Sequence, residues 1–206
     1  LAALAGCGKK ENQGTIKYTL TYQLPDSLRS YAQYLPKEAT VHFKGDSAVT
    51  IQQTSDESTT IITNRHTGFM LVLLKSAARK YAINYTRADQ DAERENMPVF
   101  SFARTDSTKN LAGQTARQYI LTDKMTGEKQ NAWFTTAIKS PQNALSLVFD
   151  PALGVPLVFS TNQNGIITHA AVKEISMDEV PAGIFSAPQD YDKITPQQLQ
   201  EMPVGN

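Results

Sequence analysis

A strict alternation of apolar and polar side chains near the start of the chain constrains its fold more than any other feature. It spans residues 14–24, GTIKYTLTYQL. One face of this segment carries Ile16, Tyr18, Leu20, Tyr22 and Leu24, and the other carries Thr15, Lys17, Thr19, Thr21 and Gln23. A period of two is typical of a strand that buries one face. We therefore expect a long, half-buried strand, which needs partner strands in a sheet.

Further strand patterns follow along the chain, separated by short polar connections. They cover residues 40–43, 48–53, 59–64, 69–75, 80–86, 99–104, 115–122, 130–135, 157–161 and 166–175. Successive strands without intervening helices favour an antiparallel meander. The clearest hairpin is expected around Asn164-Gly165, because this pair suits a turn that needs positive φ angles.

Two short helices are predicted beside the sheet. In residues 27–35 the apolar residues recur with helical spacing, with Asp26 or Ser27 as the cap and the helix ending before Pro36. In residues 141–147 a serine cap precedes a proline at the first helical position. The charged segment 87–96 suits either a solvated helix or a loop, and we favour a mobile connection.

The amino terminus carries the only cysteine of the chain. Residues 1–6, LAALAG, pass from apolar to small side chains, and a polar stretch follows Cys7 directly. This is how the apolar region of a secretory signal ends at its cleavage site. Residues 4–7 resemble the lipobox of bacterial lipoproteins, which implies a cysteine carrying diacylglycerol and acyl chains. The alternative is a frayed terminus or short strand with Cys7 as an ordinary buried thiol.

Length and charge limit the remaining choices. With 206 residues, 20 basic and 20 acidic, the chain suits one domain and has no net charge to attract nucleic acid. The longest apolar run, residues 68–74, is well short of the roughly 20 residues of a spanning helix. We expect a signal remnant, lipobox and linker over 1–13, a single β domain over 14–191 and a polar tail, extended or frayed, over 192–206.

An ordered series of short motifs marks the second half of the chain. It runs through residues 111–116 (LAGQTA), 131–135 (NAWFT), 153–157 (LGVPL), 180–181 (VP) and 185–191 (FSAPQDY). The series resembles that of a group of lipoproteins and, more distantly, the LolA/LolB/LppX-like lipoprotein-carrier superfamily. The resemblance implies a mainly β (α+β) fold: a curved antiparallel sheet, or incomplete barrel, with the two predicted helices as its lid.

A tyrosine stripe is the candidate lining of a cavity in that curved sheet. It consists of Tyr18, Tyr22, Tyr81 and Tyr85. All four lie in predicted strands whose residues alternate between the two faces. A packed core explains the same stripe without any ligand. The arginine that locks the LolA-type lid has no counterpart by motif.

The sequence contains none of the common catalytic or metal-binding patterns. His42, His66 and His169 lie far apart without a second ligand at zinc spacing. The common hydrolase, nucleotide-binding and redox motifs are absent. We therefore predict a protein without enzymatic activity, metal or cofactor beyond the acyl chains on Cys7.

The sequence thus predicts a lipoprotein of the bacterial cell envelope, anchored to the outer membrane and facing the periplasm or the cell surface. Its expected function is to bind a lipid or another hydrophobic ligand in the concavity of its sheet. The alternative is a non-catalytic interaction module that docks on an envelope protein or a glycan.

Overall fold

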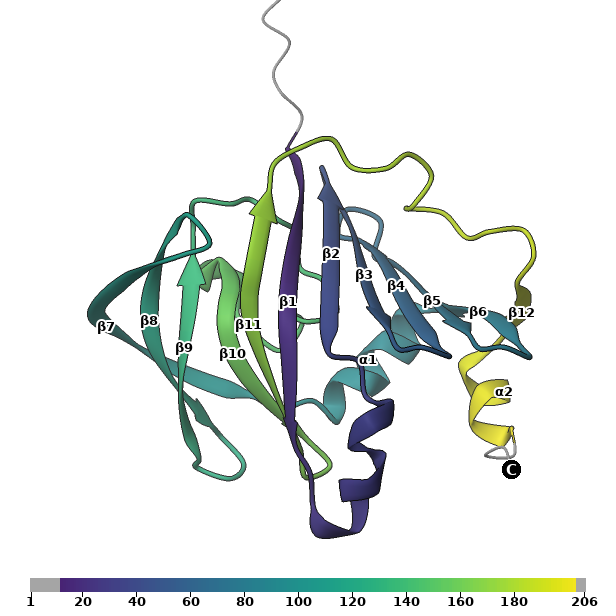
Figure 1. Ribbon diagram of the computed structural model, residues 1–206, viewed down its shortest axis with the longest axis horizontal. Helices are drawn as coiled ribbons and strands as arrows, with labels where there is room; N and C mark the ends of the chain where they lie inside the picture. The colour runs from purple at the N-terminus through teal and green to yellow at the C-terminus, as the bar shows by residue number, and fades with distance from the viewer. Residues whose placement is uncertain (1–11, 203–206) are drawn as a thin grey trace, which may run out of the picture.

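One large sheet contains every strand of the computed structural model, which describes residues 12–202 (Figure 1). The strand order is β12-β6-β5-β4-β3-β2-β1-β11-β10-β9-β8-β7. The strands are β1 (Gln13–Gln23), β2 (Glu38–Lys44), β3 (Ser47–Gln53), β4 (Ser58–Asn64), β5 (Phe69–Lys75), β6 (Lys80–Tyr85), β7 (Phe100–Leu111), β8 (Gln114–Asp123), β9 (Lys129–Thr135), β10 (Val155–Gln163), β11 (Ile166–Ser176) and β12 (Asp192–Ile194). The predicted mainly β class is confirmed.

The first strand holds two meanders together. β1 pairs with β2 on one side and with β11 on the other, both antiparallel. Strands β2–β6 and β7–β11 each follow one another as hairpins, so the pairing of β1 with β11 joins them into one sheet. Only β12, at the outer edge of β6, pairs in parallel. The alternating pattern of residues 14–24 therefore forms the strand that lies between the two halves.

The expected hairpin around Asn164-Gly165 is confirmed. Asn164 has φ 53° and Gly165 has φ 81°, and β10 and β11 pair in antiparallel register up to Gln163 and Ile166. Positive φ at both turn positions matches the right-handed twist of the flanking strands, and asparagine and glycine adopt it at low cost. A local signal was sufficient to predict this turn.

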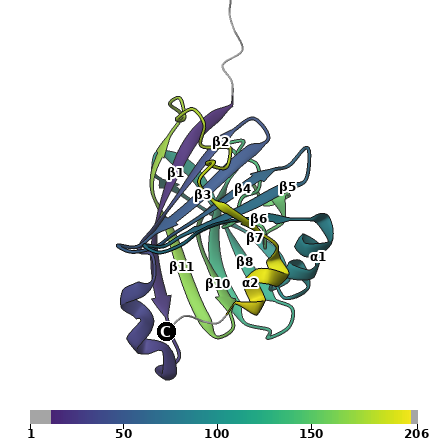
Figure 2. The ribbon, with the colours of Figure 1, turned by 90° about the vertical axis from the view of Figure 1, so that its right-hand side faces the viewer.

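The sheet is curved, and its two faces are buried by different segments. Figure 2 shows both edges of the sheet bending toward the side on which helix α1 (Arg87–Glu95) lies, so this inner face is the concave one. Apolar side chains of β1, β2, β8, β9 and β10 fill its centre, together with those of residues 138–153. On the outer face, a smaller cluster on β3–β6 packs against Ile184, Phe185 and Tyr191.

The β9–β10 connection, residues 136–154, reaches the inner face through Phe149. This side chain is 4% exposed and contacts the rings of Phe100, Phe134 and Phe159, with centroid distances of 5.8, 5.4 and 5.2 Å. Its contacts with Phe134 and Phe159 are edge-to-face and that with Phe100 is stacked, both favourable arrangements for aromatic pairs. The connection thereby covers one half of the concave face.

The predicted helix over residues 141–147 is wrong. This stretch forms irregular backbone and turns, with only the short 3-10 helix η2 (Pro151–Leu153) behind it. The buried Asn143 and Ser146 explain the difference: the Asn143 amide donates to Ser146 Oγ, and Asn143 Oδ1 accepts from the Leu145 amide. Such local side-chain bonds compete with the hydrogen bonds of a helix.

The expected helix over residues 27–35 is a 3-10 helix, η1 (Asp26–Tyr34), and does not serve as a lid. None of its residues is buried, and no side chain caps its start at Pro25. It extends beyond the lower end of β1, away from the centre of the concave face (Figure 1). Its apolar side chains thus stay largely in solvent.

Within segment 87–96, residues Arg87–Glu95 form helix α1 instead of the mobile connection that we favoured. Thr86 and Asp89 make a capping box, in which each side chain accepts from the backbone amide of the other. The chain carries this signal at Thr86 and Asp89, but no apolar periodicity accompanies it. As the link from β6 to β7, α1 connects strands near opposite edges of the sheet.

The expected extended tail after Tyr191 is also partly ordered. β12 pairs with β6, and α2 (Pro196–Glu201) follows with a capping box between Thr195 and Gln198. An ion pair between Lys80 and Asp190 joins the segment to β6. The sheet therefore ends on a strand contributed by the carboxyl-terminal part of the chain.

A substitution at Gly154, at the end of the β9–β10 connection, would test how closely this segment packs on the sheet. It has φ +92°, and a Cβ there would lie 2.3 Å from the Thr135 carbonyl oxygen. We expect Gly154→Ala to lower the free energy of unfolding by roughly 3 kcal/mol or more, through backbone strain and overlap together. Urea denaturation measures this change.

Gly127→Ala is the matched control, because Gly127 has φ +74° but open space around it. It should cost only about 1 kcal/mol, the penalty of the left-handed conformation alone. Equal losses in the two variants would show that the approach to Thr135 is not a constraint.

Candidate ligand cavity

Tyr18, the first member of the tyrosine stripe, belongs to the core. It is 1% exposed, packs edge-to-face on Phe159 and donates a hydrogen bond of 2.8 Å to the Pro156 carbonyl oxygen. Burial raises the pKa of its phenol well above the ordinary value. Tyr18 thus joins β1 to β10 and contacts no cavity among the described residues.

Tyr22, four residues further along β1, does line a cavity. Its hydroxyl donates a hydrogen bond of 2.9 Å to the Pro36 carbonyl oxygen, and partial burial raises the pKa of Tyr22 to about 12. With the hydroxyl engaged, the ring presents mainly apolar surface to the space beside it.

Tyr81 and Tyr85 lie on β6, separated from β1 by the four strands β2–β5. Their partners in β5 are Leu74 and Met70, which place them on the inner face as the alternation predicted. Neither lines any of the three cavities described below. The four tyrosines therefore do not form one continuous stripe in the structure. Of the four, only Tyr22 lines one of the three cavities.

The cavity beside Tyr22 has a volume of about 330 Å³ and a mostly apolar wall. It lies over the lower parts of β1, β10 and β11, between the turn 144–148 and the end of α1. Its lining comprises Tyr22, Leu35, Pro36, Gln52, Met97, Pro98, Ala144, Leu145, Leu147, Val148, Phe159, Thr161, Asn162, Gln163, Thr168 and Ala170. We refer to it as the apolar cavity.

A second cavity, of about 240 Å³, adjoins it under α1. The two share Met97 and Leu147 as a common wall. On the far side of this wall the lining becomes polar and charged, with Arg65, Arg87 and Arg94 near the β4–β5 turn. We refer to it as the arginine cavity.

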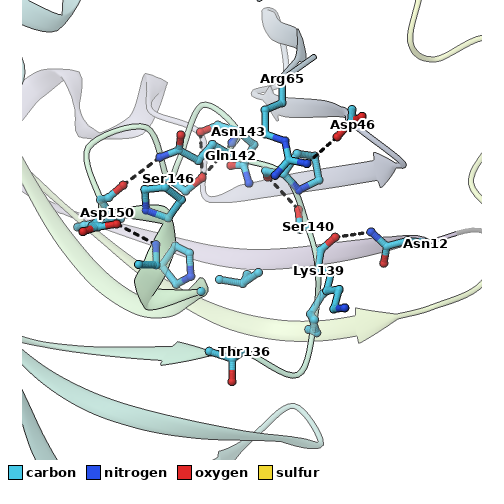
Figure 3. A pocket seen from close by; sticks show the side chains of 18 of the residues that line it. Asn12, Asp46, Arg65, Thr136, Lys139, Ser140, Gln142, Asn143, Ser146 and Asp150 are labelled. Carbon is cyan, nitrogen blue, oxygen red and sulfur yellow. Dashed lines mark hydrogen bonds and ion pairs between the residues drawn. The ribbon is translucent and has the colours of Figure 1, made fainter.

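A third cavity, of about 620 Å³, has a mixed polar and apolar lining (Figure 3). It shares Arg65 and Gln142 with the arginine cavity. Arg65 and Asp46 form an ion pair of 2.8 Å at its rim, and the Asn12 side chain donates to the Lys139 carbonyl oxygen. The carboxylate of Asp150 accepts from the Ala152 amide. Many of its polar groups thus serve to hold the connecting loops, which leaves the apolar cavity as the better hydrophobic site.

The three histidines lie apart and do not form a common site. His42 shares a hydrogen bond of 2.9 Å with Thr15, and burial together with the charge of Lys17 lowers its pKa. His169 contacts Ser160, while His66 lies exposed in the β4–β5 turn. Over residues 12–202, no group of three or more His, Cys, Asp or Glu side chains is arranged to hold a metal ion.

Several cavity residues were not singled out from the sequence. Met97 follows the charged segment that we expected to be mobile, and Leu147 lies in a predicted helix that does not form. Phe159 is part of an apolar strand pattern, without a sign of what faces it. These residues meet only through contacts over long sequence separations, so no local pattern marks them.

Cys7, the predicted lipid attachment site, lies outside the described residues, as does the whole of the expected lipobox. The first described residue is Asn12, directly before β1. Within residues 12–202, no helix combines the length and apolar character that crossing a membrane requires.

The fold places the chain in a class of mainly β proteins built on one large, mostly antiparallel open sheet. Ten chains of known structure match it. Among them is PNGF-II, solved in the C2 space group, with a TM-score of 0.51 and 11% sequence identity. The match covers 91% of this chain and 32% of that chain, so this chain spans about a third of the length of PNGF-II. At this identity the likeness concerns the fold alone.

No family model matches the chain, and no curated protein matches it by sequence. The likeness to PNGF-II therefore supports the sheet architecture and carries no activity over to this protein. Function has to be argued from the cavities themselves.

The buried tyrosines make the fold sensitive to alkaline pH. Their pKa values are raised in the folded protein, to about 12 for Tyr22, whereas an unfolded chain ionises near the ordinary value of 10.0. Stability is therefore fully present below pH 10 and falls as the pH rises toward 12. Urea denaturation over this range should show the decline, and tyrosinate absorbance should lag behind that of free tyrosine.

Tyr18→Phe and Tyr22→Phe should each flatten the decline. Tyr31→Phe is the control, because Tyr31 is 58% exposed on η1. A decline that persists unchanged in Tyr18→Phe and Tyr22→Phe would contradict the assignment.

Proposed function

We propose that this protein binds a hydrophobic, lipid-like ligand in the apolar cavity on the concave face of its sheet. The observation that carries the proposal is the mostly apolar wall around about 330 Å³ of space. Ligand cavities in proteins are concave and mostly apolar, with a few placed polar groups, and begin at about 300 Å³. Gln52 and Thr168 supply polar groups here.

The wall of the cavity can adapt to the length of a ligand. Met97, which separates the apolar cavity from the arginine cavity, has an unbranched and flexible side chain. We propose that a change of its rotamer lets a ligand extend from one cavity toward the other. An extended chain is therefore a better ligand than a compact one.

The anchoring of the protein is part of the same proposal. We propose that Cys7 carries a diacylglycerol, that the protein is a lipoprotein of the bacterial outer membrane, and that its sheet is of the LolA/LolB/LppX-like type. The lipobox-like residues 4–7 and the motif series support this. Four residues lie between Cys7 and Asn12, so the two are five Cα–Cα steps apart, a span of at most about 18 Å. A domain on so short a link would work close to the membrane surface.

A second function, an interaction module without cargo, is favoured by a different observation. Tyr31 and Tyr34 on η1 are 58% and 62% exposed, and the Phe149 aromatic cluster fills much of the concave face. Exposed tyrosines are enriched where proteins bind partners. Neither function requires catalysis, and we propose that the protein is not an enzyme.

Ala144→Trp tests ligand binding directly. Ala144 lines only the apolar cavity and is partly buried, so an indole there would occupy the space of a ligand. We expect the wild type to bind a fluorescent polyene fatty acid and the variant to bind it at least about tenfold more weakly, a loss of about 1.4 kcal/mol. Fluorescence titration gives both dissociation constants.

Ala92→Trp is the matched control, because Ala92 is exposed on α1 and lines none of the three cavities. Thermal melting of both variants shows whether they fold. A wild type that binds no probe would exclude ligand carriage and favour the interaction module.

Membrane association depends on Cys7 in this proposal. Two or more acyl chains anchor a protein stably, since each buried methylene contributes about 0.8 kcal/mol. In a bacterial host that processes lipoproteins, Cys7→Ala should move the protein from the membrane pellet to the soluble fraction. Fractionation followed by immunoblotting measures the distribution. The control is Lys9→Ala, a variant that retains Cys7. Unchanged membrane association of Cys7→Ala would refute the anchor.

A further inference from the structure

The arginine cavity contains one guanidinium without a partner. Arg65 is paired with Asp46 at 2.8 Å and Arg94 with Asp91 at 2.9 Å. Arg87, the first residue of α1, makes no hydrogen bond or ion pair with any residue of the described range 12–202. It is thus the cation of this cavity that remains available to a ligand.

The position of Arg87 is defined by the β4–β5 turn. Its Nη1 atom lies 3.0 Å from the point that a Cβ on Gly68 would occupy, so the guanidinium rests directly against this glycine. Gln90, three residues along α1, donates hydrogen bonds to the carbonyl oxygens of Gly68 and Tyr85 at 3.0 and 3.1 Å. These bonds hold α1, and with it Arg87, at the end of the sheet.

A cavity lined by arginines therefore lies next to a mostly apolar one. The arginine cavity and the apolar cavity meet at Met97 and Leu147. Arg87 lies in the first, together with the apolar side chains of Phe69 and Met70, and Tyr22 and Phe159 lie in the second. A molecule that spans both would place an apolar chain in one and a polar end at the other.

We propose that the two cavities together bind an anionic amphiphile, a single acyl chain that ends in a carboxylate or a phosphate, and that Arg87 binds the anionic end. A guanidinium suits both groups, because its planar fork donates two parallel hydrogen bonds to their oxygens. Glu93, the acidic residue in the lining of the arginine cavity, would oppose a second negative charge. This inference rests on the proposed function and specifies its ligand.

Three twelve-carbon probes test the anionic end: laurate, dodecyl phosphate and methyl laurate. The affinity of each probe is measured by its displacement of the fluorescent polyene fatty acid from the purified protein. Laurate is used below the concentration at which it forms micelles. We expect laurate or dodecyl phosphate, or both, to bind at least about tenfold more tightly than the uncharged ester. The tighter of the two anions shows whether the natural end group is a carboxylate or a phosphate.

Arg87→Gln should weaken binding of the preferred anion at least about fivefold and leave methyl laurate unchanged. Arg79→Gln is the matched control, because Arg79 is exposed in the β5–β6 turn and lines none of the three cavities. Arg87→Lys should restore part of the affinity, since it keeps the charge and loses the fork.

Two results would overturn the inference while leaving the proposed function intact: equal affinity of the wild type for the anions and the ester, or equal affinity of Arg87→Gln and Arg79→Gln for the anion. If no probe binds to the wild type, the proposed function fails together with it.

Discussion

The insertion of Phe149 into the concave face is the interaction on which the rest of this structure depends. An open sheet of twelve strands exposes an apolar inner face that needs cover. Phe149 contacts Phe134 and Phe159 from β9 and β10, and so holds the β9–β10 connection against the strands that it links. The same connection supplies Leu145, Leu147 and Val148 to the wall of the apolar cavity. Packing of the core and shape of the cavity therefore share one cause.

The segment that covers the concave face, residues 136–154, is mostly irregular backbone and leaves space between itself and the sheet. Residues 136–154 satisfy their backbone through Asn143, Ser146 and Asp150, and they occupy only part of the concave face. α1 crosses the remainder as an almost fully exposed helix. The cavities lie between these two segments and the sheet. The proposed ligand site is therefore the space that residues 136–154 and α1 leave open over the sheet.

The two ends of the sheet differ in chemistry, and this difference gives the cavities their polarity. Toward Tyr22 the walls are mostly apolar and carry no charged side chain, whereas toward the β4–β5 turn they include arginines. The two environments adjoin, because Met97 and Leu147 line both cavities. An elongated ligand with one charged end matches this gradient, and a compact or uniformly apolar one matches only half of it.

The sequence by itself determined the strands β1–β11, their antiparallel succession and the turn at Asn164-Gly165, because period-two alternation and positive-φ residues are local signals. It did not predict β12, which lies in a tail expected to be extended or frayed. It also contained the capping box at Thr86, which identifies α1 in retrospect. Only the tertiary structure decided that Tyr22 borders a cavity and that Tyr18 is buried in the core, while four strands separate Tyr81 and Tyr85 from β1. It also decided that residues 141–147 cover the sheet without forming a helix. The physical reason is that a cavity wall is assembled from residues distant in sequence, and their mutual packing leaves no trace in any local pattern.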